Sequence, residues 1–477
     1  MAERASSGAE SAEARLFSRR YRAATASFAA VMFLTGFAAL AVVPTLPTAA
    51  RDLDGVSLFP LVAGCFVAAS LLGGVLAGHW SDRAGARRPL AVGLALTVVT
   101  LVVSATSVSV WQLAAGRFLD GLAAGMVAVS IDTAIGQAYP ERLRPRALAL
   151  MSACWIVPSL TGPPLAGAVS EWWSWRLVFH GLAALTLPPS LVLVAVLRRS
   201  SWATAADTPH DRPASRPPLL LAAAVSTGAA LGQYGVSGWD VRHLPFLAAG
   251  AGLLVVCAPR LLPLGTWRAA RGLPTTVLLR GLSSGTYFTI EAFVPLMLIT
   301  ERQVPAVTTG LVFTAAAVVW AAASWVQGRL LESRPRHRLV AVGALVLAAA
   351  AALALIGTFP SVPAPAAASA MLVAAAGMGL LAPSLTVLSL SHSPPERQGG
   401  ASSAMQTSQN LGQIGAMAMS SGVLNACVAA GASEPGGYGA AFGLLLVPAL
   451  LLALLAGRAR GHVAPGPRPP LREPSAP

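Results

Sequence analysis

The sequence predicts an all-α polytopic membrane protein with fourteen membrane-spanning helices. Of its 477 residues, 55% are hydrophobic and only 11% are charged, whereas a soluble domain carries about a quarter charged residues. The mean hydropathy is +0.66. Apolar runs of about 20 residues, the length that crosses a bilayer as a helix, recur along almost the whole chain, which argues against a soluble globular fold.

Each apolar run predicts one helix, and polar stretches mark the ends of the runs. In chain order the spans are expected at 25–47, 57–78, 90–108, 111–137, 147–169, 176–197, 217–236, 244–263, 274–299, 306–328, 338–358, 364–391, 399–428 and 437–457. Grouped, they give a cytoplasmic N-terminal tail at 1–24, a six-helix bundle at 25–197, a cytoplasmic linker at 198–216, two additional transmembrane helices at 217–263, a second six-helix bundle at 274–457 and a disordered cytoplasmic tail at 458–477. The linker and the last tail are rich in Pro and Arg, a composition that does not form a packed core.

The placement of the arginines along the chain predicts how the protein is oriented in the membrane. All 33 basic residues are Arg. With the N-terminus inside, the outer segments contain only Arg51, Arg176, Arg242 and Arg302, and the spans contain only Arg117 and Arg280. The positive-inside rule therefore predicts that both termini are cytoplasmic. Because the net charge of +14 is spread over the ends of apolar runs, it does not indicate nucleic-acid binding.

A short polar stretch at 78–90 connects the second and third spans. It reads Gly-x-x-x-Asp-Arg-x-Gly-x-Arg-Arg and supplies Gly78, Asp82, Arg83, Gly85, Arg87 and Arg88. Asp82 can pair with an arginine or cap a helix, and Gly85 permits a tight turn. An ordinary cytoplasmic loop would explain the arginines, but it would not require the spacing of the glycines and the aspartate.

This stretch resembles the signature between the second and third spans of the major facilitator superfamily, from which Ala86 departs. A similar pattern recurs 250 positions later, where Gly328, Glu332, Arg338 and Gly343 stand opposite Gly78, Asp82, Arg88 and Gly93. Several transporter folds consist of two such repeated halves. With two spans between the halves, the order of six, two and six spans resembles the fourteen-span drug:proton antiporter branch of the family.

The resemblance implies a major facilitator fold, in which two six-helix bundles face each other across a central cavity and rock to expose it to either side. It implies a transporter of a bacterial plasma membrane that exports hydrophobic or cationic small molecules in exchange for protons, functions as a monomer and needs no cofactor. Residues 78–90 would form the cytoplasmic gate. Asp132, about 22 Å along the helix from Arg117, matches the family's acidic residue that can pair with this gate.

Span five resembles a second family signature. Gly162, Pro163 and Gly167 lie in the pattern Gly-Pro-x-x-Ala-Gly, which is similar to the antiporter pattern Gly-Pro-x-x-Gly-Gly; Pro158 departs from it. Such residues bend a helix and let neighbouring helices approach closely. The alternative is a kinked packing helix with no role in the direction of transport. Trp155, in the same span, is a candidate for the cavity wall.

Span four carries Arg117 and Asp120, three residues apart and so within reach of each other on a helix. The family often has Gln in place of Asp120. Ionised groups in the bilayer are costly unless they are paired or hydrated, so each is a functional candidate. We expect either a proton or substrate site in the cavity or an ion pair that only fixes packing.

Span nine carries Arg280, Tyr287 and Glu291 at spacings that place all three on one helical stripe. This predicts a face that lines water rather than lipid, with a structural pair to another helix as the alternative. Arg280 and Glu291 are about 16 Å apart along the helix, too far for a direct pair. Glu291 is therefore the carboxylate expected to exchange a proton during transport.

Span thirteen has an amide stripe made by Gln406, Gln409 and Gln413, which predicts either a cavity lining or hydrogen bonds that hold neighbouring helices together. No sequence motif of a metal site, a nucleotide loop or a nucleophilic hydrolase is found. The expectation is thus a transporter and not an enzyme, with protons, a small molecule and the bilayer as partners and no metal. Transport of a polar metabolite and an integral membrane enzyme acting on lipids are the two alternatives.

Overall fold

The computed structural model describes residues 16–18, 21–140, 143, 147, 150–151, 153–199, 219–238, 241–329, 331, 333–393 and 398–460. Within these residues the secondary structure is helical. Most of the expected N-terminal tail (1–24), linker (198–216) and C-terminal tail (458–477) lies outside the described residues.

The first part of the chain, which we call the N-half, contains α2 (Arg22–Ala41), α3 (Leu46–Asp52), α4 (Phe59–Ala84), α5 (Arg87–Ala105), α6 (Val110–Ala138), α8 (Ile156–Trp172) and α9 (Trp175–Arg199). Two further helices follow, α11 (Leu219–Gly235) and α12 (Leu244–Cys257). The last part, the C-half, contains α13 (Leu273–Thr300), α14 (Ala306–Arg329), α15 (Arg336–Ile356), α16 (Ala364–Ser391), α17 (Gln398–Ala429) and α18 (Glu434–Leu455).

Twelve helical segments of the described chain are long and apolar enough to cross a membrane. The other two expected spans coincide with α8 and α11, which have 17 residues each in the described chain. Membrane-spanning helices need about 20 residues. Twelve spans are thus supported by length and composition, and the expected number of fourteen is not established by the structure.

The same helix pairings occur in both halves. In the N-half, α4 and α5 pack on α6, α5 packs on α9, and α2 packs on α8 and α9; in the C-half, α14 and α15 pack on α16, α15 packs on α18, and α13 packs on α17 and α18. Two glycines in the repeated pattern have equivalent surroundings: Gly93 of α5 lies against Met126 and Val127 of α6, and Gly343 of α15 lies against Gly377 and Leu381 of α16. The two halves therefore share one architecture, as expected for a duplicated unit.

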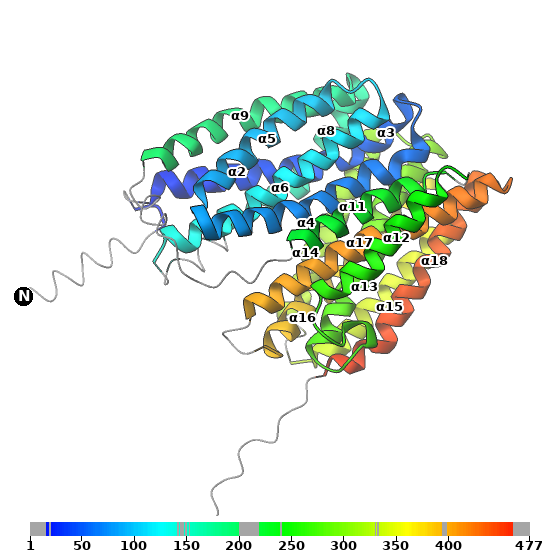
Figure 1. Ribbon diagram of the computed structural model, residues 1–477. Coiled ribbons are helices and arrows are strands. Elements are labelled where there is room, and N and C mark those ends of the chain that lie inside the picture. Colours follow the sequence, from blue (N-terminus) through cyan, green and yellow to red (C-terminus); the bar gives the residue numbers. More distant parts are fainter. Residues whose placement is uncertain are drawn as a thin grey trace, which may run out of the picture.

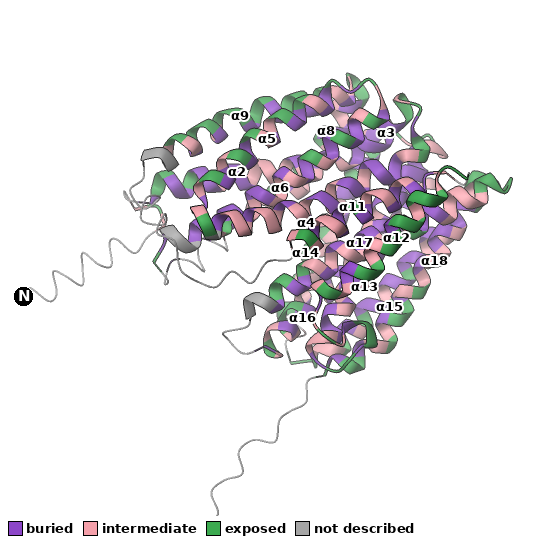
Figure 2. Ribbon diagram, viewed as in Figure 1, coloured by how far each residue is buried: buried purple, intermediate pink, exposed green. Residues whose placement is uncertain are grey.

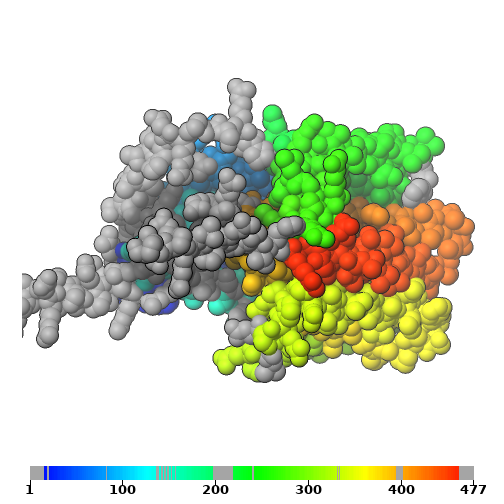
Figure 3. All heavy atoms as spheres, turned by 90° about the horizontal axis from the view of Figure 1, so that it is seen from below, coloured from blue at the N-terminus to red at the C-terminus, as the bar shows by residue number. Residues whose placement is uncertain are grey.

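The halves meet along two seams with matching positions in the repeat, one between α8 and α14 and the other between α4 and α17. Helix α11 packs against both α4 and α17, so it lies beside the second seam only. In Figure 1 the helices of the two halves lie closest near α3 and diverge toward the end at which α2 begins. In Figure 3 the red of α18 lies beside the yellow of the α15–α16 region, in agreement with the packing of α15 on α18.

Helix α13 is the most buried span. In its most apolar 18-residue window 78% of the residues are buried, compared with 17% for the span that begins with α12. Figure 2 shows the same contrast, with exposed residues along α12 and α9 on the outside of the molecule. Phe59 of α4 and Phe293 of α13 meet edge to face at 6.4 Å between ring centroids, which places α13 at the boundary between the halves.

Candidate functional site

The central feature of α13 is the pair formed by Tyr287 and Glu291, one helical turn apart. The Tyr287 hydroxyl donates to Oε1 of Glu291 at 3.1 Å. Tyr287 is 5% exposed and Glu291 is half-buried. Within the described chain Glu291 forms no salt bridge. The carboxyl group is therefore held inside the protein by a neutral donor, without a cation beside it.

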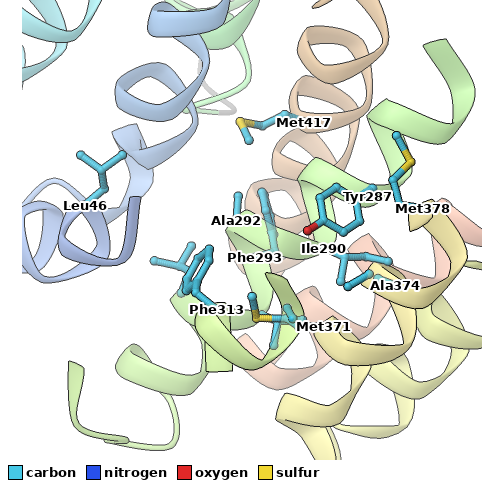
Figure 4. Packing of buried hydrophobic residues seen from close by; sticks show 14 of the residues in the cluster. Leu46, Tyr287, Ile290, Ala292, Phe293, Phe313, Met371, Ala374, Met378 and Met417 are labelled. Carbon is cyan, nitrogen blue, oxygen red and sulfur yellow. The ribbon is translucent and has the colours of Figure 1, made fainter. Parts of the chain in front are cut away.

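The surroundings of this pair are apolar and aromatic. The ring of Tyr287 meets Trp320 of α14 edge to face at 4.9 Å and Phe288 of α13 at 5.0 Å. Figure 4 shows Tyr287 among apolar side chains of α13 and α16, close to Ile290 and Met378. Flexible methionines and aromatic rings adapt to apolar molecules of different shapes, so this region can bind an apolar group beside a carboxyl.

Arg280 forms a different contact on the same helix. Its Nε and Nη2 both donate to Oε1 of Gln409 on α17, at 3.0 and 2.6 Å. Its Nη1 is buried and has no hydrogen-bond partner, and no acidic side chain pairs with Arg280 in the described chain. Arg280 and Glu291 thus have separate partners, as their separation along the helix led us to expect. In the described chain, the guanidinium of Arg280 is hydrogen-bonded to a neutral amide and no carboxylate neutralises its charge.

The amide stripe of α17 divides into side chains with different roles. Gln409 bonds Arg280, so it links α17 to α13. Gln406 is exposed and donates to Asn410 at 3.2 Å, whereas Gln413 is buried. One amide of the stripe thus joins two helices, as one of the two alternatives predicted, and the lining of a cavity by the stripe stays a prediction.

Close packing brings α13 and α17 together, and sequence reasoning did not single out the residues responsible. A Cβ at Gly412 would overlap the carbonyl of Gly281, and the Ser408 hydroxyl donates to the Val277 carbonyl at 2.7 Å. The spacing of Gly281 and Gly285 at i and i+4 was the available signal, because small residues one turn apart favour close helix contacts.

Arg117 and Asp120 form a buried ion pair within α6. Arg117 Nη1 and Asp120 Oδ2 are 2.6 Å apart, and the two residues are 2% and 4% exposed. The guanidinium lies over the ring of Phe66 at 4.4 Å. The next residue, Gly121, fits against the Phe66 backbone with no room for a Cβ. These contacts with α4 favour a role in packing over a role in the cavity.

The prolines of α8 lie in the seam with α14. Because Pro164 has no N–H, the carbonyl of Leu160 loses its helical partner. The hydroxyl of Thr314 on α14 donates to this carbonyl at 2.7 Å. Thr314 was missed by sequence reasoning, since nothing in its local sequence indicates which helix it faces. The proline thus leaves a carbonyl free for a hydrogen bond between the halves.

The glycines of the span-five pattern also differ in their roles. A Cβ at Gly167 would lie 2.6 Å from the Ala306 carbonyl of α14, so this glycine permits the close approach of the two helices. A Cβ at Gly162 would make an ordinary contact at 3.5 Å with Ala41. Pro158 is buried. Trp155 lies before the start of α8 and against Gly36 of α2, which places it in a packing contact within the N-half.

The stretch 78–90 is mostly helical, which corrects its interpretation as a polar loop. Helix α4 continues to Ala84 and α5 begins at Arg87, so only two residues connect them. Gly85 adopts φ 72° and ψ 163°, an extended conformation with positive φ that is essentially restricted to glycine, and α4 ends there. The apolar run ends at Gly78, but the helical backbone hydrogen bonds of α4 continue to Ala84. The length of the apolar run therefore underestimates the length of the helix.

The expected gate contacts are only partly described. The side chain of Asp82 lies outside the described residues, so its pairing remains a prediction. Arg83 and Arg88 are exposed and Arg87 is half-buried. Asp132 is exposed and forms no salt bridge with these three arginines in the described part of the chain. A Cβ at Gly78 would meet Val129 at 3.9 Å, so helix packing does not require glycine there.

The fold and these buried polar groups define a polytopic membrane protein of two similar helical halves, each with ionisable side chains inside its helix bundle. The chain belongs to the major facilitator superfamily, whose family model matches residues 28–417. The match covers the N-half from within α2, the two helices that follow it, and the C-half as far as the middle of α17; α18 lies outside it.

The descriptions of two curated relatives refer to multidrug efflux and to multidrug resistance. A protein of Mycobacterium tuberculosis described as a probable multidrug-efflux transporter is 28% identical over 391 residues, 78% of this chain and 81% of the relative. Multidrug resistance protein 1 of Bacillus subtilis is 30% identical over 159 residues, 33% of this chain and 40% of the relative.

Similar solved structures include a peptide transporter of the POT family in complex with sulfate. It superposes with a TM-score of 0.69 at 16% identity, covering 91% of this chain and 94% of the other. A POT family transporter in complex with a thioalcohol conjugated peptide gives a TM-score of 0.70 at 11% identity, covering 92% and 97%. At these identities the likeness concerns the fold alone.

Proposed function

We propose that the protein is a secondary active transporter that exports hydrophobic or cationic small molecules in exchange for protons, by alternating access of a site between its halves. The observation that carries this proposal is the Tyr287–Glu291 pair, a carboxyl without a cation in an aromatic region of the central helix α13. The descriptions of the curated relatives support it.

The proposed exchange follows from the charge of Glu291. A bare carboxylate inside a membrane protein is costly, and either a bound proton or a bound cation removes that cost. Tyr287 can donate to Glu291 when it is ionised, which makes the empty state accessible. A proton and a cationic substrate then compete for one carboxyl, and this competition is what couples the two fluxes in opposite directions.

A second candidate is transport of a polar metabolite with an acidic group. Arg280 favours it, because its charge has no acidic partner among the described residues and its Nη1 has no hydrogen-bond partner. An anionic substrate could complete the coordination that Gln409 begins. In that case the apolar surroundings of Tyr287 would bind the rest of the molecule.

The transport proposal is tested with purified protein in liposomes carrying an imposed pH gradient, using a panel of lipophilic cations and a matched panel of organic anions. We expect efflux of lipophilic cations that stops when an uncoupler collapses the gradient. Gradient-dependent movement of the anions alone would instead favour the second candidate. Chemical alteration of lipids, without movement of either panel, would favour a membrane enzyme.

The proposal includes fourteen spans in a bacterial plasma membrane, both termini in the cytoplasm and a cytoplasmic gate at 78–90. Reporter fusions test this topology. We expect cytoplasmic signals after residues 88, 210 and 465 and an outside signal at 240, because the positive-inside rule places the arginine-rich ends in the cytoplasm. A cytoplasmic signal at 240 would remove the two extra spans, and an outside signal at 88 would contradict the gate.

A further inference from the structure

The predicted outer end of the molecule contains a turn that joins α13 to α14, at residues 301–305, and two charged residues of the N-half contact this turn or the helix ends beside it. Arg51, near the end of α3, donates through Nη1 to the carbonyl of Ile299 and to Oε1 of Gln303, both at 3.2 Å. Ile299 lies in the last turn of α13, where carbonyls have no helical partner and carry the negative end of the helix dipole. The positively charged guanidinium of Arg51 is therefore bound at the negative end of the α13 dipole, where it is electrostatically favoured.

The second charged residue is Glu171, near the end of α8. Its Oε2 accepts the backbone N–H of Val307 at 3.0 Å. Val307 lies in the first turn of α14, where N–H groups are unpaired and carry the positive end of the dipole. An anion of the N-half thus caps a helix of the C-half. The two charges have opposite signs, and each matches the helix end that it contacts.

The C-half holds the turn in the shape that these contacts need. Gln303 adopts φ 52°, which is uncommon for a residue other than glycine, and its Nε2 donates to the Thr300 carbonyl at 2.7 Å. Arg302 donates to the carbonyls of Gly357 and Phe359 within the same half. Since the turn is fixed from its own side, breaking the contacts with Arg51 and Glu171 would separate the halves without unfolding the turn.

We propose that Arg51 and Glu171 form an outer latch, a pair of charge-to-helix-end contacts that holds the outer ends of the two halves together in the state seen here. This inference rests on the proposed alternating access. The latch releases when the outer end opens, and it sets the balance between the two states. Other charged contacts at the same end stay within one half, such as Asp52 with Arg176 at 2.8 Å, so they provide matched controls.

The test measures the distance between spin labels at Val108 and Ser361, exposed residues of the two halves. The protein is placed in lipid nanodiscs after the four native cysteines, which are unpaired, are replaced by alanine. The measurements are made at pH 6. Burial and a hydrogen bond with the Glu434 carboxyl raise the pKa of Glu301 to about 7, so Glu301 beside the turn stays largely protonated at this pH.

Glu171→Gln keeps an acceptor for the Val307 N–H and removes only the charge. Arg51→Gln removes the charge and shortens the side chain, so it also removes the donor to the Ile299 carbonyl. We expect each to raise the ratio of long to short distances about twofold to fivefold, the range for one exposed helix-terminal charge. Glu171→Asp and Arg51→Lys should restore part of the short-distance population. Added salt should lengthen the distances in the parent but not in the double variant, since both side chains are exposed.

Asp52→Asn is the control, because it removes a charged contact within one half. Unchanged distances in Glu171→Gln and Arg51→Gln would overturn the latch, and so would an equal shift in Asp52→Asn. The distance measurement needs neither substrate nor a pH gradient. A distance shift in a protein that moves no substrate would therefore support the latch and reject the transport proposal. Failure of the latch and failure of the transport proposal can thus be distinguished.

Discussion

Glu291→Gln is expected to abolish proton-driven efflux and to leave the downhill exchange of substrate. Glutamine keeps the size of the side chain and an oxygen that can accept from Tyr287, whose hydroxyl lies 3.1 Å from Oε1 of Glu291. It cannot gain or lose a proton. Because no other partner balances this carboxyl in the described chain, a permanently neutral residue should remove the competition between proton and substrate.

The measurement is efflux from proteoliposomes with and without a pH gradient, compared with counterflow of labelled substrate at equal pH on both sides. Tyr287→Phe is the matched variant, since it removes the donor but retains the titrating carboxyl. It should respond to the gradient with a changed pH profile. A Glu291→Gln protein that responds to the gradient like the parent would contradict this role, and Asp120 would become the leading carboxylate.

Gly412→Ala should cause a large loss of stability. Gly412 of α17 lies directly on the carbonyl of Gly281 in α13, and a Cβ there would overlap backbone atoms that cannot turn away as a side chain can. The two helices would have to separate, which would also strain the contact between Arg280 and Gln409. Overpacking at such a position costs about 1–3 kcal/mol.

Gly415→Ala on the same helix is the control, because a Cβ at Gly415 has no neighbouring atom within 4 Å. Both variants lose a glycine within α17, so their intrinsic helix propensities change equally. The apparent unfolding temperature of the purified protein in detergent should fall for Gly412→Ala and stay level or rise for Gly415→Ala. Equal temperatures in the two variants would show that the α13–α17 contact does not limit stability.

Local features of the site were predictable from the sequence. Tyr287 and Glu291 are four residues apart and Arg117 and Asp120 are three apart, so helical geometry alone brings each pair within reach. The structure places both pairs in contact. Gly85 was identified as a turn residue because few other residues tolerate the backbone conformation that it adopts. Membership of the major facilitator superfamily was likewise indicated by motifs within single stretches of the chain, and the family match confirms it.

Contacts between helices were decided by the tertiary structure. Arg280 and Gln409, Thr314 and Leu160, and Arg51 and Ile299 are 129, 154 and 248 residues apart in sequence. In a membrane protein almost every helix is apolar on all sides, so hydropathy does not show which face meets another helix and which meets lipid. Helix periodicity fixes which residues share a face, whereas the partner of that face depends on how the halves pack. The sequence by itself therefore determined that the chain is a helical membrane protein and which side chains lie within reach of each other on one helix, whereas the expected number of fourteen spans was not established. Only the packing of the halves decided that Arg280 binds an amide, that Thr314 bonds a carbonyl freed by proline, and that Arg51 and Glu171 lie at opposite ends of one turn.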